Sequence, residues 1–244
     1  MAWPLLGPAA SALARRNVSG GDYPFTLGVA SGEPSPDGFV IWTRLAPKPL
    51  EGGGMPAENV EVRWSVAEDE KMTKVVAKGT ATATPELAHA VHVEVPGLEP
   101  NRWYFYQFAG ANELSPVGRT RTAPRAEDSP ERLRFAFASC QHWESGYYTA
   151  YKHMAEEDLD LVAHLGDYIY EYPGKENQVR KHVGPLLDLL VDYRNRHAQY
   201  KTDEHLQTMH AKCPWIVTWD DHEFANNCAG LISEKPEETT PIYT

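Results

Sequence analysis

The segment "LDLVAHLGDYIYEY", residues 159–172, most constrains how this chain can fold. Its first half is an apolar run of strand type that ends at one acid, Asp167, followed by Tyr168, Tyr170 and Tyr172. A carboxylate in this position is explained either by a surface turn or by a metal ion held at the mouth of a parallel sheet. The rest of the sequence has to decide between these two explanations.

Composition limits the class of protein. The chain has 244 residues, 42% of them hydrophobic and 23% charged, which predicts a globular protein with one large domain or two ordinary ones. A formal net charge of -11 argues against a nucleic-acid scaffold, because binding to a phosphate backbone relies on clustered Lys and Arg. Since no run approaches the roughly 20 apolar residues of a membrane-spanning helix, we expect no membrane span.

The first residues, 1–22, begin with an apolar and alanine-rich stretch in which Ala10 and Ala12 are spaced like a signal-peptidase site. The basic pair Arg15 and Arg16 follows this stretch instead of preceding it, so the export signal is incomplete. An export remnant and the ragged start of a truncated chain explain these residues equally well. We therefore expect a signal remnant or disorder here, in a secreted or periplasmic protein.

Three cysteines, Cys140, Cys213 and Cys228, form neither an even disulfide framework nor a CxxC zinc pattern. Cys213 and Cys228 could pair only if the fold brings them together. The sequence favours small buried residues at both positions.

Residues 23–124 have the pattern of an antiparallel β-sandwich, since short stretches rich in Val, Thr and aromatics alternate with Pro and Gly. Val62 and Val66 alternate with polar residues, as in a strand with one buried face. Tyr104 and Tyr106 follow a Leu-Pro turn, as in fibronectin-type or immunoglobulin-like sandwiches. The predicted strands lie in "YPFTLGVASG", "GFVIWTRLAP", "VEVRWSVAED", "AHAVHVEVPGL", "NRWYFYQFAG" and "VGRTRTAP".

A polar, proline-bearing segment suits a linker at 125–132, and the pattern changes in 133–244. There, apolar strands in "RLRFAFASC", "LDLVAHLGD" and "PWIVTWDD" alternate with helical stretches, one of them with a break at 201–203. This order predicts a parallel sheet covered on both faces. The expected fold class is therefore α+β with two domains, a β-sandwich followed by an α/β domain.

The three predicted strands end at 139–142, 166–168 and 220–223, which supply a thiol, carboxylates, a phenol and imidazoles. Because ligands bind outside the carboxyl ends of strands in open α/β sheets, we expect these ends to face one cleft. Clustered acids repel one another unless a cation neutralises them, so this set favours a metal centre.

Each group also has a simpler explanation. Asp167 fits a turn, Asp220 and Asp221 fit the N-cap and first turn of a helix in "HEFANN", and Cys140 fits a buried hydrophobic site. The coincidence of three strand ends is what favours the metal.

These segments resemble the PhoD-like alkaline phosphatases of the calcineurin-like metallophosphoesterase group. The matching stretches are "YPFTLGVASGEPSPDGFVIWTRL", "FAFASCQ", "HLGDYIYEY" and "YRNRHAQYKTDEHLQTMHAKCPWIVTWDDHEFANN", which together span about 23–227. The resemblance implies an Ig-like sandwich followed by the N-terminal part of an α/β metallophosphatase domain.

The same resemblance implies hydrolysis of phosphate monoesters or diesters at an iron and calcium centre. Cys140, Asp167 and Tyr170 would bind the ferric ion, and Asp167 would bridge it to a second metal bound by Asp221. His222 would lie beside the phosphate and protonate the leaving oxygen or stabilise phosphoryl charge. His142, Asn226 and Asn227 receive no role beyond hydrogen bonding around the centre.

Length is the main departure, because the resemblance implies a later half with further ligands and a second sheet. A fragment, a truncated product and one segment of a two-chain assembly all stay open, and self-association or the missing half would then complete the site. An inactive fragment that serves as an extracellular binding module is the alternative function, and hydrolysis of other phosphate-containing esters is a third option.

Overall fold

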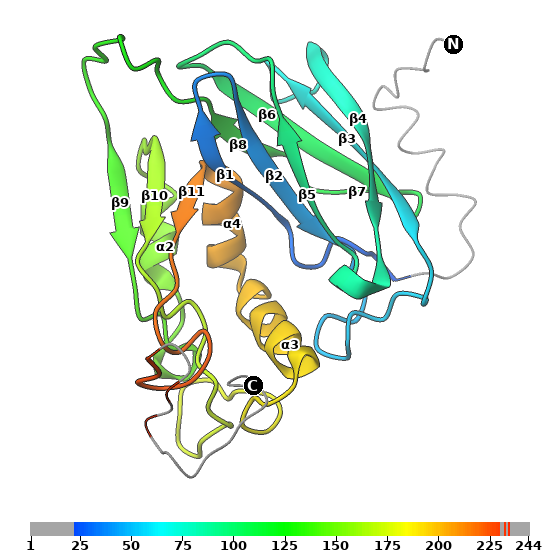
Figure 1. Cartoon of the computed structure of the whole chain (residues 1–244), viewed down its shortest axis with the longest axis vertical. Coiled ribbons are helices and arrows are strands. Elements are labelled where there is room, and N and C mark those ends of the chain that lie inside the picture. Colours follow the sequence, from blue (N-terminus) through cyan, green and yellow to red (C-terminus); the bar gives the residue numbers. More distant parts are fainter. Residues whose placement is uncertain (1–21, 230–231, 233, 235–244) are drawn as a thin grey trace.

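The structure, a computed structural model, describes residues 22–229, 232 and 234. The expectation for residues 1–22 therefore lies outside the described residues except at Asp22. Figure 1 shows two layers of strands in the first half of the chain and three further strands beside them. The strands of the described part are β1 Val29–Ser35, β2 Gly38–Arg44, β3 Val60–Ala67, β4 Val75–Ala83, β5 Ala90–Val95, β6 Trp103–Gly110, β7 Glu113–Leu114, β8 Gly118–Arg121, β9 Phe135–Ala138, β10 Leu161–His164 and β11 Trp215–Val217.

The first half forms a β-sandwich. One layer has the strand order β4-β3-β6-β7 with β8 also paired to β6, and the other contains β5, β2 and β1. Val62 and Val66 are fully buried, which confirms the alternation predicted for β3. Between the layers lies one apolar core, whose buried members are Phe25, Val29, Phe39, Ile41, Leu45, Val62, Val66, Ala83, Val91, Val93, Val95, Tyr104, Tyr106 and Phe108.

Tyr104 is hydrogen-bonded to the turn that precedes its own strand, β6. Its hydroxyl accepts a hydrogen bond from the backbone N–H of Glu99 at 3.0 Å, five residues upstream. A tyrosine that bonds back to its preceding turn is the tyrosine corner of sandwich folds. The Tyr104 side chain is buried, so the turn and the core are fixed together.

Strand β4 was not predicted, because its sequence, "VVAKGTATA", is mostly small and polar. It lies at an edge of its layer, where one side chain in two faces solvent. Gly79 is required there, since a Cβ atom would lie 2.6 Å from Cζ2 of the Trp64 ring. Contact with Trp64 of β3 therefore explains this strand better than the hydrophobic pattern of β4 does.

One sheet runs through both halves of the molecule, in the order β5-β2-β1-β11-β10-β9. Its two parts meet where β1 pairs in parallel with β11, at Gly32 and Trp215. A Cβ atom on Gly32 would lie 2.6 Å from the Trp215 carbonyl oxygen, so a glycine is needed at the crossing. The sandwich and the second half thus share backbone hydrogen bonding, which nothing in the sequence indicates.

In the second half, β9, β10 and β11 run parallel, as predicted. Helix α4 packs against α2, β1 and β8, between this part of the sheet and the sandwich (Figure 1). The helices of the described part are α2 Thr149–Met154, α3 Leu190–Lys201 and α4 Glu204–Lys212, with short 3₁₀ turns η1 Pro85–Leu87 and η2 Trp143–Ser145.

The helix predictions were right at one point and wrong at another. The predicted break at 201–203 is present, because Asp203 caps α4 by accepting the N–H groups of His205 and Leu206. Residues 222–229 form turns and no helix, so the helix-capping explanation of Asp220 and Asp221 is wrong. Among the described residues we find no helix with the length and hydrophobicity that crossing a bilayer requires.

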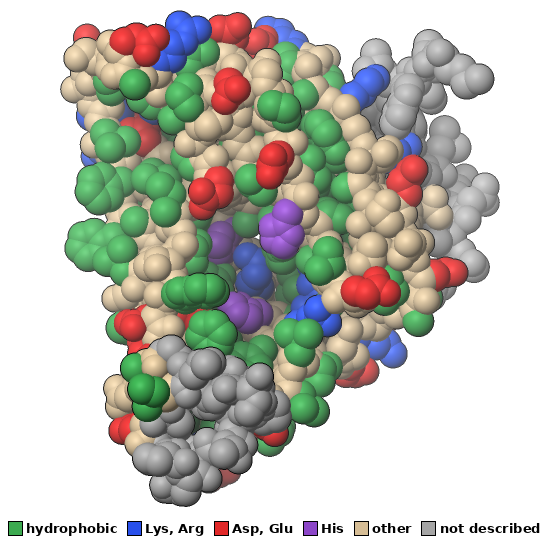
Figure 2. All heavy atoms as spheres, viewed as in Figure 1, with side chains coloured by type: hydrophobic (Ala, Val, Ile, Leu, Met, Phe, Trp, Pro, Cys, Tyr) green, Lys and Arg blue, Asp and Glu red, His purple; other side chains and the backbone are tan. Residues whose placement is uncertain are grey.

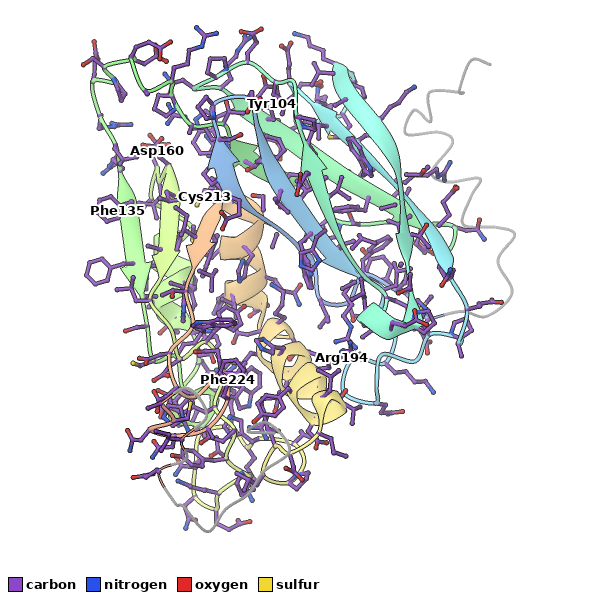
Figure 3. All side chains as sticks on the ribbon, viewed as in Figure 1. Tyr104, Phe135, Asp160, Arg194, Cys213 and Phe224 are labelled. Atoms are coloured by element: carbon purple, nitrogen blue, oxygen red, sulfur yellow. The ribbon has the colours of Figure 1, made fainter. Side chains whose placement is uncertain are left out.

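The prediction of a sheet covered on both faces was wrong for the described residues. Val162 and Trp215 are buried on the face that the helices cover, but Phe135, Phe137 and Ile216 are exposed on the other face. Figure 2 shows hydrophobic side chains on the surface along β9, and Figure 3 labels Phe135 there. The apolar pattern indicated two buried faces, whereas the described part of the chain supplies layers for only one.

The three cysteines are free thiols. Cys213 is fully buried in the core of the second half, which confirms the simpler expectation for it. No pairing of Cys213 with Cys228 occurs in the described residues.

Candidate metal centre

The ends of β9, β10 and β11 lie together, as the sequence predicts. The N–H of Cys140 donates to the Gly166 carbonyl at 3.1 Å, and that of Gln141 donates to the Asp167 carbonyl at 3.1 Å. Gly166 has φ +104°, and a Cβ atom there would lie 2.5 Å from Cβ of Asp220. The glycine in this Gly-Asp pair therefore permits the close approach of two strand ends.

Asp167 lies at the centre of this region. It is buried, and its backbone adopts the left-handed conformation with φ 53°, which is uncommon for residues other than glycine. Its Oδ2 accepts a hydrogen bond from the Tyr170 hydroxyl at 3.0 Å, whereas its Oδ1 is buried with no hydrogen-bond partner in the described part of the chain. A buried carboxylate oxygen without a partner is costly, so Oδ1 fits a metal ligand.

Tyr170 lies between two imidazoles and beside the acid. Its ring centroid is 4.5 Å from that of His142 and 4.2 Å from that of His222. Burial raises the pKa of Tyr170 above its ordinary value, and the neighbouring Asp167 and Cys140 raise it further. The tyrosine is therefore a neutral phenol in the metal-free chain, and it would become an anionic ligand only opposite a strong positive charge.

Cys140 lies on the β9 side next to Tyr170, and its thiol is not one of the ligand atoms that cluster at Asp167, Asp221 and His222. It has φ 54°, and its side chain is exposed at the mouth of the site. The expectation that it is a buried hydrophobic residue is therefore wrong. Its left-handed backbone turns the chain at the strand end, as Asp167 does in the neighbouring strand end.

Asp221 and His222 come to Asp167 from the third strand end. One ligand atom from each of the three residues lies within 4.8 Å of the others. His222 is held in place by Glu171, whose Oε2 lies 2.7 Å from Nδ1 of the imidazole. This contact leaves Nε2 of His222 available to a metal or to a substrate oxygen.

Two acids of this region were missed by sequence reasoning. Besides fixing His222, Glu171 accepts the N–H of Asn226 at 2.9 Å. The Glu223 carboxylate accepts the backbone N–H groups of Asp167 at 3.1 Å and Asp220 at 2.6 Å, and also that of Tyr168. Glu223 thereby joins two strand ends. The only sequence signal was its place in "DDHE", beside the predicted ligand.

The residues left without a role contact a predicted ligand or Glu171, the acid that orients His222. His142 packs on Tyr170, the Asn226 N–H donates to Glu171, and the Asn227 N–H donates to Asp221 Oδ2. In both asparagines the backbone and not the side chain makes this contact. They hold the loop that carries Asp221 and His222.

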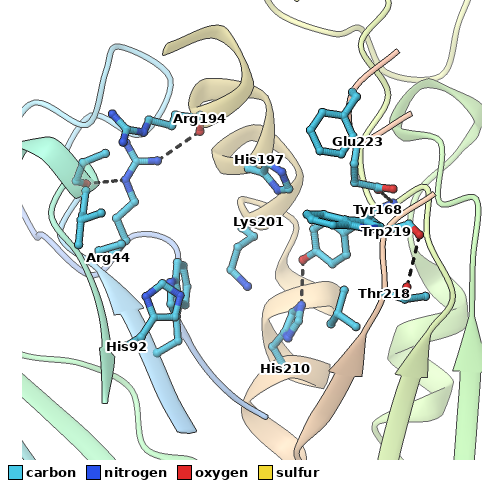
Figure 4. Close-up of a pocket in the computed structure, with 16 residues that line it drawn as sticks. Arg44, His92, Tyr168, Arg194, His197, Lys201, His210, Thr218, Trp219 and Glu223 are labelled. Carbon is cyan, nitrogen blue, oxygen red and sulfur yellow. Dashed lines mark hydrogen bonds between the residues drawn. The ribbon is translucent and has the colours of Figure 1, made fainter. Parts of the chain in front are cut away.

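The largest cavity that we describe, of about 820 Å³, is not this centre. It lies between the sandwich and α3 and α4, where Figure 2 shows histidines and basic side chains around a hollow. Figure 4 shows Lys201 and His210 on one side and Arg44 and His92 on the other. Tyr168 and Glu223 line this cavity, and Glu223 also accepts the backbone N–H of Asp167 in the candidate metal centre.

Comparison with known proteins identifies the family. The model of the PhoD-like phosphatase family matches residues 135–242, and the model of the N-terminal domain of PhoD-like phosphatases matches residues 10–124. The chain belongs to the PhoD-like phosphatase family. It is 59% identical over 218 residues to alkaline phosphatase D of Bacillus subtilis, and this match covers 87% of the chain.

A solved structure of PhoD has the same fold, with a TM-score of 0.89 and 56% sequence identity over 93% of the chain. The chain spans 37% of the length of alkaline phosphatase D and 44% of the chain in the PhoD structure. The match therefore shows the family and the fold of this part.

Proposed function

We propose that this chain carries part of the metal centre of a phosphoesterase that hydrolyses phosphate monoesters or diesters. The observation that carries the proposal is the buried, unpartnered Oδ1 of Asp167, which lies in one group with Asp221 and His222. We further propose that the sandwich is immunoglobulin-like, on the basis of its tyrosine corner at Tyr104, and that the second half is an α/β metallophosphatase domain.

The residues present fit an iron and calcium pair. Cys140, Asp167 and Tyr170 would hold the ferric ion, since thiolate and phenolate are anionic donors. Asp167 would bridge to calcium, which Asp221 would bind through oxygen, the donor that calcium prefers. When bound, such a pair supplies positive charge opposite the phosphate oxygens and activates an oxygen nucleophile.

His222 would act on the substrate directly. Glu171 accepts the Nδ1 proton and fixes the orientation of the imidazole, so Nε2 is the atom that would donate a proton to the leaving oxygen or hydrogen-bond to the phosphoryl group. Burial of His222 and Asp167 keeps water from these atoms and strengthens their interactions. We also propose secretion or a periplasmic location for the protein, as the resemblance implies.

The test combines elemental analysis with hydrolysis of a chromogenic phosphomonoester and phosphodiester by the purified chain with added calcium. We expect bound iron, and loss of both iron and turnover on Asp167→Asn. Metal and turnover that persist in Asp167→Asn would overturn the proposal. A folded, metal-free and inactive chain would mean that these ligands are insufficient by themselves, and that the chain is an inactive fragment.

A further inference from the structure

A second group of ligand-type side chains lies next to this centre. His142, Glu144 and His182 each offer one ligand atom, and these atoms lie within 4.8 Å of one another. His142 and Glu144 come from the loop after β9 and from η2, and His182 comes from the long segment between β10 and α3. His142 joins the two groups, since its ring packs against Tyr170.

Glu144 is a buried carboxylate with one oxygen unused. The residue is 0% exposed, and its Oε1 accepts the backbone N–H groups of Lys175 at 2.9 Å and His182 at 3.1 Å. Its Oε2 is buried with no hydrogen-bond partner among the residues described. Burial acts to raise the pKa of Glu144, but the hydrogen bonds from the backbone N–H groups of Lys175 and His182 lower it, and the pKa lies below its ordinary value. A buried negative charge therefore faces a space between two imidazoles.

His182 presents a free nitrogen to that oxygen. Its Nε2 lies 2.9 Å from the Tyr200 hydroxyl, whereas its buried Nδ1 has no partner in the described part of the chain and lies 3.7 Å from Glu144 Oε2. Burial lowers the pKa of His182 to about 3, and Arg196 contributes to the lowering. A neutral imidazole does not cancel the charge on Glu144, so the two groups do not form an ion pair at neutral pH.

We propose that His142, Glu144 and His182 bind a divalent transition-metal ion, with Zn²⁺ as the best match. Two imidazoles and one carboxylate are a common zinc ligand set, while calcium selects oxygen ligands only. Ligands about 2.1 Å from a tetrahedral ion lie roughly 3.4 Å apart, and the gap between Glu144 Oε2 and His182 Nδ1 is 3.7 Å. The half-exposed His142 offers the third ligand atom within 4.8 Å of the other two, and a tetrahedral ion would keep a fourth position for water.

The surroundings fix two of these ligands. The Tyr200 hydroxyl contacts Nε2 of His182 and accepts the N–H of Trp143 at 3.1 Å, so it holds the imidazole with Nδ1 toward Glu144. Hydrogen bonds from groups outside the ligand shell are usual for metal-binding histidines. A bound ion would tie the segment that carries His182 to the loop that carries His142, beside Tyr170 of the first centre.

The test separates the two sites by working in the Asp167→Asn chain, which should lose the first centre. After treatment with a chelator, this chain is titrated with Zn²⁺ by calorimetry, and its thermal unfolding is measured with and without Zn²⁺. We expect one zinc ion per chain and a higher unfolding temperature with zinc. Adding His142→Ala or Glu144→Gln should weaken binding roughly 100-fold and remove the shift.

His153→Ala is the matched control, because it also removes a histidine that lies 3.7 Å from an acid. This pair, His153 and Glu156, is exposed on the surface and is not part of the proposed site. It should leave zinc binding unchanged. His142→Ala removes a half-exposed ring and should fold, which circular dichroism checks, so the test does not depend on the buried Glu144 alone. Zinc affinity that stays within about threefold in both His142→Ala and Glu144→Gln would overturn the proposal, as would absence of binding in the Asp167→Asn chain.

Discussion

The sandwich and the strand-end region use unusual backbone conformations differently. In the sandwich, left-handed residues such as Asn101 and Asn112 lie in tight turns between strands. In the strand-end region, Cys140 and Asp167 adopt the same conformation and carry a thiol and a carboxylate into one site. In the sandwich the left-handed residues form turns between strands, whereas in the strand-end region they position candidate ligands.

The two regions also differ in how they treat apolar surface. Every layer of the sandwich faces another, whereas the parallel strands leave Phe135, Phe137 and Ile216 in solvent. We therefore expect stability to come mainly from the sandwich and the helix-covered face, and function from the strand ends.

We expect the largest effect on stability from a comparison of two phenylalanines. Phe108 of β6 is 0% exposed and Phe137 of β9 is 67% exposed. Phe108→Ala should lower the free energy of unfolding by about 3–5 kcal/mol, because it leaves a cavity in the sandwich core. Phe137→Ala should change it by less than about 0.5 kcal/mol. Chemical denaturation measures both, and equal losses would mean that the exposed face is covered in solution.

The next effect is a pH dependence at the boundary between the regions. Burial lowers the pKa of Lys201 to about 7, and its ammonium lies 4.6 Å from the Trp42 ring centroid in the large cavity (Figure 4). The unfolded chain keeps this proton up to about pH 10.4, so between about pH 7 and 10.4 it binds more protons than the folded chain. This lysine should therefore make stability rise with pH in that window, by at most about 1.4 kcal/mol per pH unit.

Lys201→Met tests this expectation. The variant should be more stable than the parent at pH 7, and the difference should shrink toward pH 10. Unfolding curves at several pH values measure the difference, in which titrating groups that do not interact with Lys201 cancel. A difference that does not change with pH would show that Lys201 keeps its ordinary pKa.

A smaller effect concerns the acid that joins two strand ends. Glu223→Gln replaces a carboxylate that accepts backbone N–H groups of Asp167, Tyr168 and Asp220. It should cost about 1–2 kcal/mol of stability and weaken metal binding at Asp167, because charge-assisted hydrogen bonds are lost. Glu157→Gln, at an exposed pair with Arg134, is the control and should have little effect. Unchanged metal affinity in Glu223→Gln would show that the strand ends hold together without this acid.

The sequence predicted the strand ends well because the signals are local. Apolar runs that stop at Cys140, Asp167 and Asp221 give both the parallel strands and the edge where they converge. The roles of Glu171 and Glu223 could not be predicted, since their partners lie about 50 residues away and the contacts depend on loop conformation. The pairing of β1 with β11 could not be predicted either, because a single glycine where two strands cross leaves no periodic pattern in the sequence.

The smallest effect is expected at Asp167, and its comparison with Asp160 asks whether each acid serves stability or function. Asp160 accepts the N–H of Arg134 at 2.9 Å and is paired with Arg121, so both of its oxygens have partners. Asp167 keeps one buried oxygen without a partner. Asp160→Asn should therefore lower the stability of the metal-free chain by about 1–3 kcal/mol.

Asp167→Asn should leave the metal-free chain as stable as the parent, or more stable by up to about 1 kcal/mol. The amide relieves an uncompensated buried charge, can still accept the Tyr170 hydroxyl, and tolerates the left-handed backbone at φ 53°. Thermal unfolding in the presence of a chelator makes the comparison. A loss as large as that of Asp160→Asn would mean that Asp167 is a structural acid. If Asp167→Asn keeps its stability but loses metal binding, Asp167 serves to bind the metal and contributes nothing to the stability of the fold.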